Sequence, residues 1–222
     1  MAGMAGTVVH MAFAGLLAAA LLGAAYDRRA VLLVVGVTAL ADLDSFIALV
    51  SAGTHRAALH NFVIPAVAAG LLLADTRLRQ GSLLRARYGH YGVRVAWVAI
   101  VAYAVAGVGL DMVAGGVNPL YPLFDQFYVL DGKIELSNQR GIVQTFVETS
   151  SSSGNSVPAP QSLGSTKEFS YSTGVDPDPG GTQTDPERIF PVVRAGWQLL
   201  VLVVGTVVTL ARFRVAHDLP DR

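Results

Sequence analysis

Residues 39–62, ALADLDSFIALVSAGTHRAALHNF, place two aspartates and two histidines in one of the most apolar regions of the chain. Each of these polar side chains is unfavourable in a lipid environment unless a partner compensates it. If the flanking sequence belongs to a membrane protein, the four side chains therefore need a reason to be there. The composition of the flanking sequence shows whether this is a membrane protein.

The composition of the whole chain is typical of a membrane protein. Of its 222 residues, 52% are hydrophobic and only 14% are charged, which is too apolar for an ordinary soluble domain of this size. Each of five apolar runs is long enough to cross a hydrocarbon layer of about 30 Å at about 1.5 Å per residue. These runs are residues 6–26, 30–50, 57–74, 93–113 and 191–211. We therefore predict an all-α integral membrane protein with about five transmembrane helices.

The arginines predict the orientation of these helices. Most of them gather in three places, which are the link between the first two runs, the link between the third and fourth runs, and the end of the chain: Arg28, Arg29, Arg77, Arg79, Arg85, Arg87, Arg94, Arg212 and Arg214. Basic loops stay on the cytoplasmic side of a membrane. We predict a multi-pass protein of the cell membrane, with its N-terminus outside and its C-terminus cytoplasmic. No basic residue precedes the first run, so we expect it to be a retained helix rather than a signal peptide.

Three regions follow from this topology. Residues 1–113 form a four-helix membrane core, residues 114–190 an extracytoplasmic segment, and residues 191–222 the final helix with a cytoplasmic tail. In the outer segment, Asp131-Gly132 between β-prone flanks predicts a small hairpin, and a third strand is expected at 141–148. Residues 149–185 are rich in Ser, Gly, Pro, Thr and Asp, which predicts a flexible loop.

Ionisable residues in the apolar runs share one depth in the predicted membrane. His10, Asp42, Asp44, His60 and Asp111 fall about 3 to 12 Å from the outer ends of their helices. His55 and Arg56 lie in the adjoining outer loop. Four helices thus bring carboxylates or imidazoles to one level, and a divalent cation would compensate them.

The residue types limit the kind of metal site. The chain has no cysteine, so structural disulfides and thiolate ligands are excluded. Carboxylate and imidazole ligands suit zinc, manganese or iron, and we favour zinc or manganese. The ligand candidates are His10, Asp42, Asp44, His55, His60 and Asp111.

Helix geometry narrows the roles of these candidates. Asp42 and Asp44 lie about 200° apart around a helix, so we expect one to be a ligand and the other to support it. Arg56 and His60 are four residues apart and would share a helix face, which places a cation beside the metal where it can bind an anion. We expect Arg56 and Asp44 to have catalytic roles, Arg56 by stabilising negative charge and Asp44 as a general base.

These residues resemble the motifs of a known family, the membrane-bound metal-dependent hydrolases related to bacterial YdjM. The family pattern has an early helical His, then Pro-Asp-x-Asp, His-Arg-Gly-x-Thr-His-Ser, Leu-Asp and a Gly-rich stretch before Leu-Trp/Tyr-Pro. The corresponding segments here are His10, ADLD at 41–44, HRAALHN at 55–61, GLD at 109–111 and GGVNPLYPL at 115–123. Ala41, Ala57 and Asn61 replace the proline, glycine and serine of the pattern. The resemblance covers about the first 150 residues and implies hydrolysis that depends on a bound metal.

The favoured hypothesis is a membrane-embedded, metal-dependent hydrolase with its site near the outer face. The shallow site suggests a phosphoester of an amphiphilic or lipid substrate, and membrane lipids are the expected surroundings. No contact with nucleic acid is predicted, and no organic cofactor. A non-enzymatic metal-binding membrane protein, acting as a sensor or assembly factor, remains an alternative. A transporter is a weaker one, because the inner halves of the helices lack charged residues and a transport path needs polar groups across the membrane.

Other polar residues near the outer face have simpler interpretations. Asn118 and Tyr121 follow a helix in a Gly/Pro-rich turn, where they either shape the turn or contact substrate. Arg194 and Trp197 begin the last run and are explained by snorkelling and by an interfacial aromatic belt.

Overall fold

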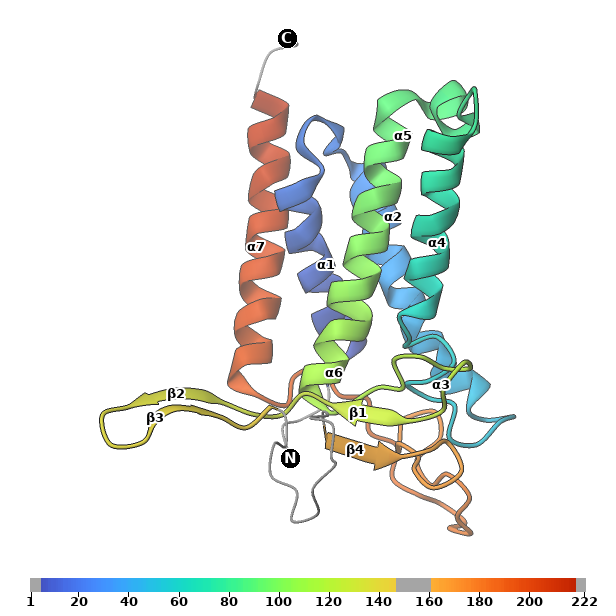
Figure 1. The fold of residues 1–222 in the computed structure, drawn as a ribbon, viewed down its shortest axis with the longest axis vertical. Helices are drawn as coiled ribbons and strands as arrows, with labels where there is room; N and C mark the ends of the chain where they lie inside the picture. Colours follow the sequence, from blue (N-terminus) through green and yellow to red (C-terminus); the bar gives the residue numbers. More distant parts are fainter. Residues whose placement is uncertain (1–4, 147–160, 219–222) are drawn as a thin grey trace.

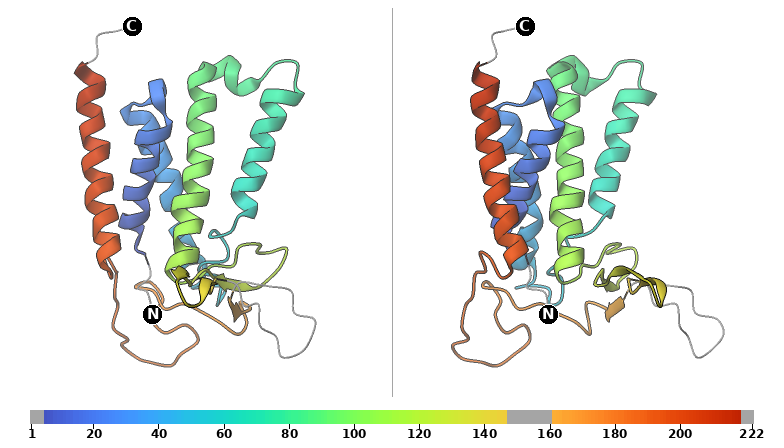
Figure 2. Two further views of the ribbon diagram at one scale, coloured as in Figure 1. Left: turned by 60° about the vertical axis from the view of Figure 1, so that its left-hand side comes forward. Right: turned by 90° about the vertical axis from the view of Figure 1, so that its left-hand side faces the viewer.

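The structure is a computed structural model and describes residues 5–146 and 161–218, with side chains as far as residue 215. Its helices form a bundle of rods that run side by side (Figures 1 and 2). The first rod is α1, Thr7–Leu21, which is followed by the short 3-10 turn η1, Gly23–Ala25. The second rod begins with α2, Arg28–Ala39. It continues through the 3-10 turn η2, Leu40–Leu43, and α3, Asp44–Ile47. The third is α4, Val63–Leu73, with the π-helical turn η3, Ala74–Leu78. The fourth is α5, Leu83–Ala102, continued by the π-helical segment η4, Tyr103–Gly109, and by α6, Leu110–Ala114; the fifth is α7, Gly196–Asp218.

Three of these rods are long and apolar enough to cross a membrane, judged by length and composition. They are Arg28–Ile47, Leu83–Ala114 and Gly196–Val215. The α1 helix is apolar but shorter, and α4 with its π-helical turn is shorter as well. The predicted count of five spanning helices is therefore not supported on this measure, although membrane association is.

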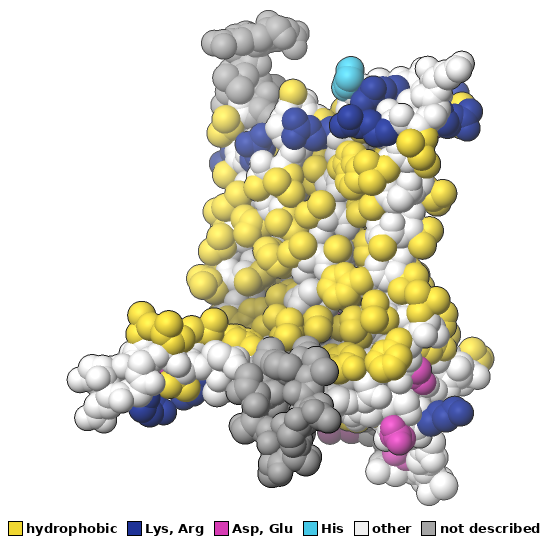
Figure 3. Space-filling view, in the orientation of Figure 1, with side chains coloured by type: hydrophobic (Ala, Val, Ile, Leu, Met, Phe, Trp, Pro, Cys, Tyr) yellow, Lys and Arg dark blue, Asp and Glu magenta, His cyan; other side chains and the backbone are white. Residues whose placement is uncertain are grey.

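Basic side chains gather at one end of the bundle. Figure 3 shows a band of Lys and Arg across this end and a broad hydrophobic surface below it. Two helices begin there with a side-chain cap. The Ala30 N–H donates to Asp27 Oδ1 at 2.8 Å, and the Arg85 N–H donates to the Ser82 hydroxyl at 3.1 Å, as short polar side chains do at helix N-termini.

Small residues allow α1 to pack closely against α7. A Cβ on Gly205 would collide with the backbone carbonyl of Ala12, and one on Gly15 would lie 2.7 Å from Thr209 Oγ1. Such small-residue contacts are typical of helix pairs in membranes. On its other side α1 packs against α2, and an apolar core that includes Leu22, Val34 and Val98 fills the bundle.

The third rod begins later than predicted. Residues 57–62 form turns, and α4 starts only at Val63. Arg56 has a φ of +62°, and the backbone N–H groups of Arg56 and Leu59 both donate to the carboxylate of Asp44. A positive φ is incompatible with a right-handed helix, so no helix passes through Arg56, and the prediction that Arg56 and His60 share a helix face is wrong.

The strands pair differently from the prediction. Strand β1, Phe127–Val129, pairs antiparallel with β4, Gln161–Gly164, while β2, Ile134–Ser137, pairs with β3, Gly141–Gln144. A hairpin does form, but it turns at 138–140, and the predicted hairpin across Asp131-Gly132 is wrong. Strand β1 finds a partner more than 30 residues away, which local turn chemistry does not encode.

Part of the predicted flexible loop carries structure. Residues 149–160 lie outside the described residues, but the chain from residue 161 onward contains β4 and passes beneath the helix ends (Figure 1). The rings of Phe127, Phe169 and Tyr171 contact one another, with centroids 4.8 to 5.7 Å apart. Strand β1 and the later segment are thereby joined next to the ends of α3 and α6.

Candidate metal centre

Four side chains from four separate elements meet at one end of the bundle, opposite the arginine-rich end. They are His10 on α1, Asp42 on η2, His60 in the turn before α4, and Asp111 on α6. One ligand atom from each lies within 4.8 Å of all the others. This group, here called the His/Asp cluster, can hold a metal ion.

Hydrogen bonds on the far side of each ring turn both imidazoles toward the cluster. His10 Nδ1 donates to the carbonyl of Ala106 at 2.5 Å, and His60 Nδ1 lies 2.9 Å from Asp44 Oδ2. Since a carbonyl only accepts, the proton of a neutral His10 is on Nδ1. The Nε2 atoms of both rings make no hydrogen bond within the described residues. Metal-binding histidines commonly have this arrangement, with one nitrogen anchored and the other available.

The carbonyl that anchors His10 belongs to an irregular part of a helix. Ala106 lies within η4, where the backbone widens from α- to π-helical hydrogen bonding. Single π-helical turns occur often at functional sites, because they change which backbone groups are engaged. Nothing in the sequence of this segment indicates the irregularity.

The spacing of the ligand atoms fits a small divalent ion. His10 Nε2 and His60 Nε2 each lie 3.3 Å from an oxygen of Asp111, and His60 Nε2 lies 3.4 Å from Asp42 Oδ1. Four tetrahedral ligands with bonds of about 2.0 to 2.1 Å would be separated by about 3.3 to 3.4 Å. One oxygen of Asp42 also has no hydrogen-bond partner within the described residues. The two histidines approach different oxygens of Asp111, and one atom from each of the four residues lies within 4.8 Å of the others, so the four residues could hold a small metal ion.

Charge favours a cation at the same place. The carboxylates of Asp42, Asp44 and Asp111 lie close together, and Arg56 is the one guanidinium that pairs with them among the described residues. Histidines that bind a metal are neutral, and with neutral histidines these residues carry an excess of negative charge in a largely buried region. Buried charge is stable only when it is paired or binds a metal, so a divalent ion would compensate the excess.

Two of the six predicted ligands lie outside the His/Asp cluster. Asp44 is fully buried, and its carboxylate lies 2.8 Å from His55 Nδ1 and 2.9 Å from His60 Nδ1. Its second oxygen also accepts the Arg56 N–H at 2.9 Å. Asp44 thus orients two imidazoles, while Asp42 faces the cluster. His55 is bound to Asp44 rather than to the ion site and lines the neighbouring cavity.

The orienting role of Asp44 leads to a prediction. Asp44→Asn would replace a carboxylate that fixes His60 with an amide that cannot accept from all the same donors, and we expect metal affinity to fall by about 10- to 100-fold. A metal titration of the purified protein against a competing chelator measures this. Asp75→Asn, at the arginine-rich end, is the matched control and should leave the affinity unchanged. An unaltered affinity in Asp44→Asn would contradict the role assigned to Asp44.

Arg56 is clamped at the edge of the cluster. Its guanidinium is 1% exposed, donates to Asp111 Oδ1 at 2.8 Å and to the Gly116 carbonyl at 3.2 Å, and stacks on the Tyr171 ring at 4.9 Å. Burial raises the pKa of Tyr171 to about 12, although the positive charge of Arg56 opposes this. Tyr171 therefore stays a neutral phenol, and its hydroxyl donates to the carbonyls of Gly115 and Gly116.

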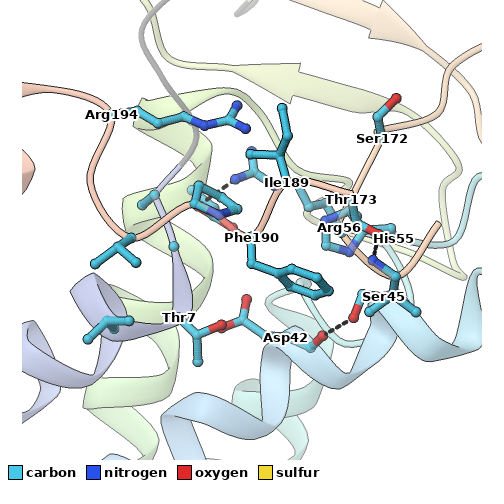
Figure 4. Close-up of a pocket in the computed structure, with 18 residues that line it drawn as sticks. Thr7, Asp42, Ser45, His55, Arg56, Ser172, Thr173, Ile189, Phe190 and Arg194 are labelled. Atoms are coloured by element: carbon cyan, nitrogen blue, oxygen red, sulfur yellow. Dashed lines mark hydrogen bonds and ion pairs between the residues drawn. The ribbon is translucent and has the colours of Figure 1, made fainter. Parts of the chain in front are cut away.

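A cavity of about 280 Å³ opens beside the cluster (Figure 4). Its polar wall comprises Asp42, Asp111, His55 and Arg56. Apolar side chains also line the cavity, and they include Val8, Ile189, Phe190 and Val192. Ile189 and Phe190 are 50% and 68% exposed, so the apolar wall is open to the surroundings.

Several cavity residues were not indicated by the sequence. Thr7, Ser45 and residues 172–175 line the cavity, and Figure 4 shows Thr7 beside Asp42. Arg194, interpreted above as a snorkelling residue, also lines the cavity. These contributions come from a low-complexity segment and a helix start that contain no motif. Asn118 is buried and bonded to Asp125 at 2.7 Å, so it shapes its turn, and neither Asn118 nor Tyr121 lines the cavity.

Fold and site together define a helical protein with long apolar helices and a buried His/Asp group at one end that can bind a metal ion. Comparisons with family models, curated proteins and solved structures found no match to this chain. Membership of the YdjM-related family therefore stays a prediction.

Proposed function

We propose that this protein is an integral membrane hydrolase that depends on a divalent metal ion, with zinc or manganese as the ion. The observation that carries the proposal is the convergence of two free imidazole Nε2 atoms and two carboxylates beside a cavity that also contains a buried arginine. His10, Asp42, His60 and Asp111 would hold the ion. When bound, the ion supplies a Lewis acid that polarises the bond to be cut and promotes deprotonation of water.

The surrounding side chains have separate tasks in this proposal. Arg56 lines the cavity and would stabilise negative charge that develops on the substrate. His55, held by Asp44 through Nδ1, would accept a proton from water and return it to the leaving alcohol. Asp44 then acts by orienting His55 and His60 rather than as the base itself.

The cavity supports an amphiphilic phosphoester as the substrate. Arg56 and Arg194 on its lining would attract an anionic headgroup, and the open apolar wall at Ile189 and Phe190 would contact an acyl or prenyl chain. Hydrolysis would break the ester P–O bond, place the hydroxyl of water on phosphorus and transfer a proton to the departing alcohol.

A transport function has less support. The helical segments between the His/Asp cluster and the arginine-rich end carry no charged side chain; they are residues 11–21, 30–41, 63–74, 95–110 and 196–211. A transporter needs polar groups along its path. The site instead resembles a pocket that opens at one end.

Metal analysis combined with a hydrolysis screen tests the proposal. The protein would be purified in mild detergent, its metal content measured, and lipid and prenyl phosphoesters supplied with and without a chelator. We expect stoichiometric metal and turnover that the chelator removes and added metal restores. Bound metal without turnover of any ester would favour the alternative, a non-enzymatic metal-binding membrane protein, and absence of metal would contradict both.

We further propose that all five rods cross the membrane, with the metal centre outside and the arginine-rich end in the cytoplasm. The shared direction of the rods (Figures 1 and 2) and the arginine band at one end (Figure 3) support this. The chain has no cysteine, so single cysteines can report sidedness. In intact cells, a membrane-impermeant maleimide should label Asn138→Cys, whereas Gln80→Cys should react only after permeabilisation. The reverse pattern would contradict this orientation.

Relation to the YdjM-like hydrolases is also proposed, because the four cluster residues all lie in the motifs that carry the resemblance. The departure at Asn61 does not weaken it. The Asn61 amide accepts the Ile64 N–H at 3.1 Å and donates to Ala57, which places it at the start of α4. A serine can serve as such a helix cap too.

A further inference from the structure

The β2–β3 hairpin projects sideways from the end of the bundle that holds the metal centre. Figure 1 shows it extending beyond α7, across the direction of the helices. Its register pairs Ile134 with Gln144 and Leu136 with Ile142. The hairpin takes no part in lining the cavity, so it needs a separate explanation.

The two faces of this hairpin differ sharply. Successive side chains alternate between faces and paired residues share one, so Ile134, Leu136 and Ile142 lie together. They are 68%, 85% and 75% exposed. The other face carries Glu135, whose carboxylate lies 2.7 Å from Lys133 Nζ and 3.5 Å from the Arg140 guanidinium. In Figure 3 hydrophobic side chains cover the upper side of the hairpin, which is directed toward the helices, and basic side chains lie on its lower side.

The apolar face continues the surface that the helices present to lipid. The exposed side of α7 is also apolar, with Leu199, Leu200 and Val203 each more than half exposed. A two-stranded hairpin is marginally stable in water by itself and needs a surface to cover its hydrophobic face. In the membrane orientation proposed above, this face would be directed toward the bilayer beside the bundle, and the charged face toward water.

We propose that the β2–β3 hairpin is a membrane-interface anchor, whose Ile134, Leu136 and Ile142 insert at the boundary between headgroups and acyl chains of the outer leaflet. Lys133 and Arg140 remain on the aqueous side. The anchor would hold the outer segment, including β1 and the chain that leads to the cavity, against the bilayer. The inference uses the membrane orientation proposed above but does not depend on metal binding or hydrolysis.

Fluorescent labels on single cysteines test the anchor. Leu136→Cys and Ile142→Cys, one on each strand, would carry an environment-sensitive fluorophore in the full-length protein reconstituted into phosphatidylcholine vesicles. Val143→Cys, on the opposite face of the same strand as Ile142, is the matched control. Each labelled protein must elute like the unlabelled parent and keep its helical circular dichroism, which shows that the bundle is intact.

The proposal predicts opposite quenching patterns for the two faces. Labels at 136 and 142 should be quenched several-fold more by lipids with a nitroxide near the headgroup than the label at 143, since interfacial segments lie about 5 to 10 Å deep. The label at 143 should be the more sensitive to aqueous iodide. Equal iodide access at all three sites would overturn the anchor. The labels at 136 and 142 could instead be shielded from both the nitroxide lipids and iodide, and lose that shielding when the protein is diluted in the vesicles. That result would also overturn the anchor and would identify a second copy of this chain as the partner.

Discussion

Substitution of His60 by alanine is expected to release the metal from the purified protein and to abolish chelator-sensitive hydrolysis. His60 Nε2 lies 3.3 and 3.4 Å from the carboxylates of Asp111 and Asp42, and its removal leaves three of the four ligands. Loss of a residue that only orients a ligand lowers metal affinity by about 10- to 100-fold. Loss of the ligand itself should lower it further. The metal-to-protein ratio after gel filtration, and competition with a chelator, measure the change.

His90→Ala is the matched control for this prediction. His90 is exposed at the arginine-rich end, so its removal should leave metal content and activity unchanged. His10→Ala provides a second test, because His10 lies on a different helix and offers the other free Nε2. Both cluster variants should elute with the wild-type protein and keep its helical circular dichroism. Wild-type metal content in both of them would contradict the metal centre.

Arg56→Gln should separate catalysis from metal binding. Its guanidinium lies against Asp111 and lines the cavity, while its Nε makes no hydrogen bond within the described residues. Arg56 thus has an unused donor at a residue that lines the cavity. Removing such a group typically lowers turnover by about 10²- to 10³-fold. We expect that loss in kcat with metal content retained, measured on the best ester from the screen.

The stability of this variant needs its own measurement. Breaking a buried ion pair costs about 3 to 5 kcal/mol, so activity must be compared well below the unfolding temperature of each protein. Arg87→Gln, at the opposite end of the bundle, controls for the loss of an arginine elsewhere. Arg56→Lys keeps the charge and should recover part of the turnover. If activity and metal fall together in Arg56→Gln, the arginine acts only through Asp111 and the catalytic role is refuted.

The sequence was informative wherever the controlling physics is local. Hydropathy over windows of about 20 residues identified the apolar helices, because the free energy of placing a helix in lipid is roughly a sum over its residues. The depth argument brought His10, Asp42, Asp44, His60 and Asp111 to one level, and the structure places all of these except Asp44 in one group. The 200° separation of Asp42 and Asp44 predicted that only one would be a ligand, although it did not say which.

Local reasoning was less reliable in the segments between helices. The Asp131-Gly132 turn was a reasonable hairpin signal, yet β1 pairs with β4 and the hairpin forms at 134–144. Composition indicated a flexible loop, and Tyr171 within it stacks on Arg56 beside the site. Such contacts depend on residues far apart in sequence, and their stability comes from burial that exists only after the helices have assembled.

What the sequence determined by itself was therefore the apolar helices, the concentration of arginines in the links at one end of the bundle and the common level of the His and Asp residues. What the tertiary structure decided was the division of roles among them. Asp44 accepts from His55, His60 and a backbone N–H, and so becomes the residue that orients them, while Asp42 faces the ion site. The carbonyl of Ala106, in a π-helical segment of the fourth rod, turns His10 inward. A hydrogen bond between groups 11 to 96 residues apart depends on how helices pack and where their backbones become irregular, and no local pattern encodes either.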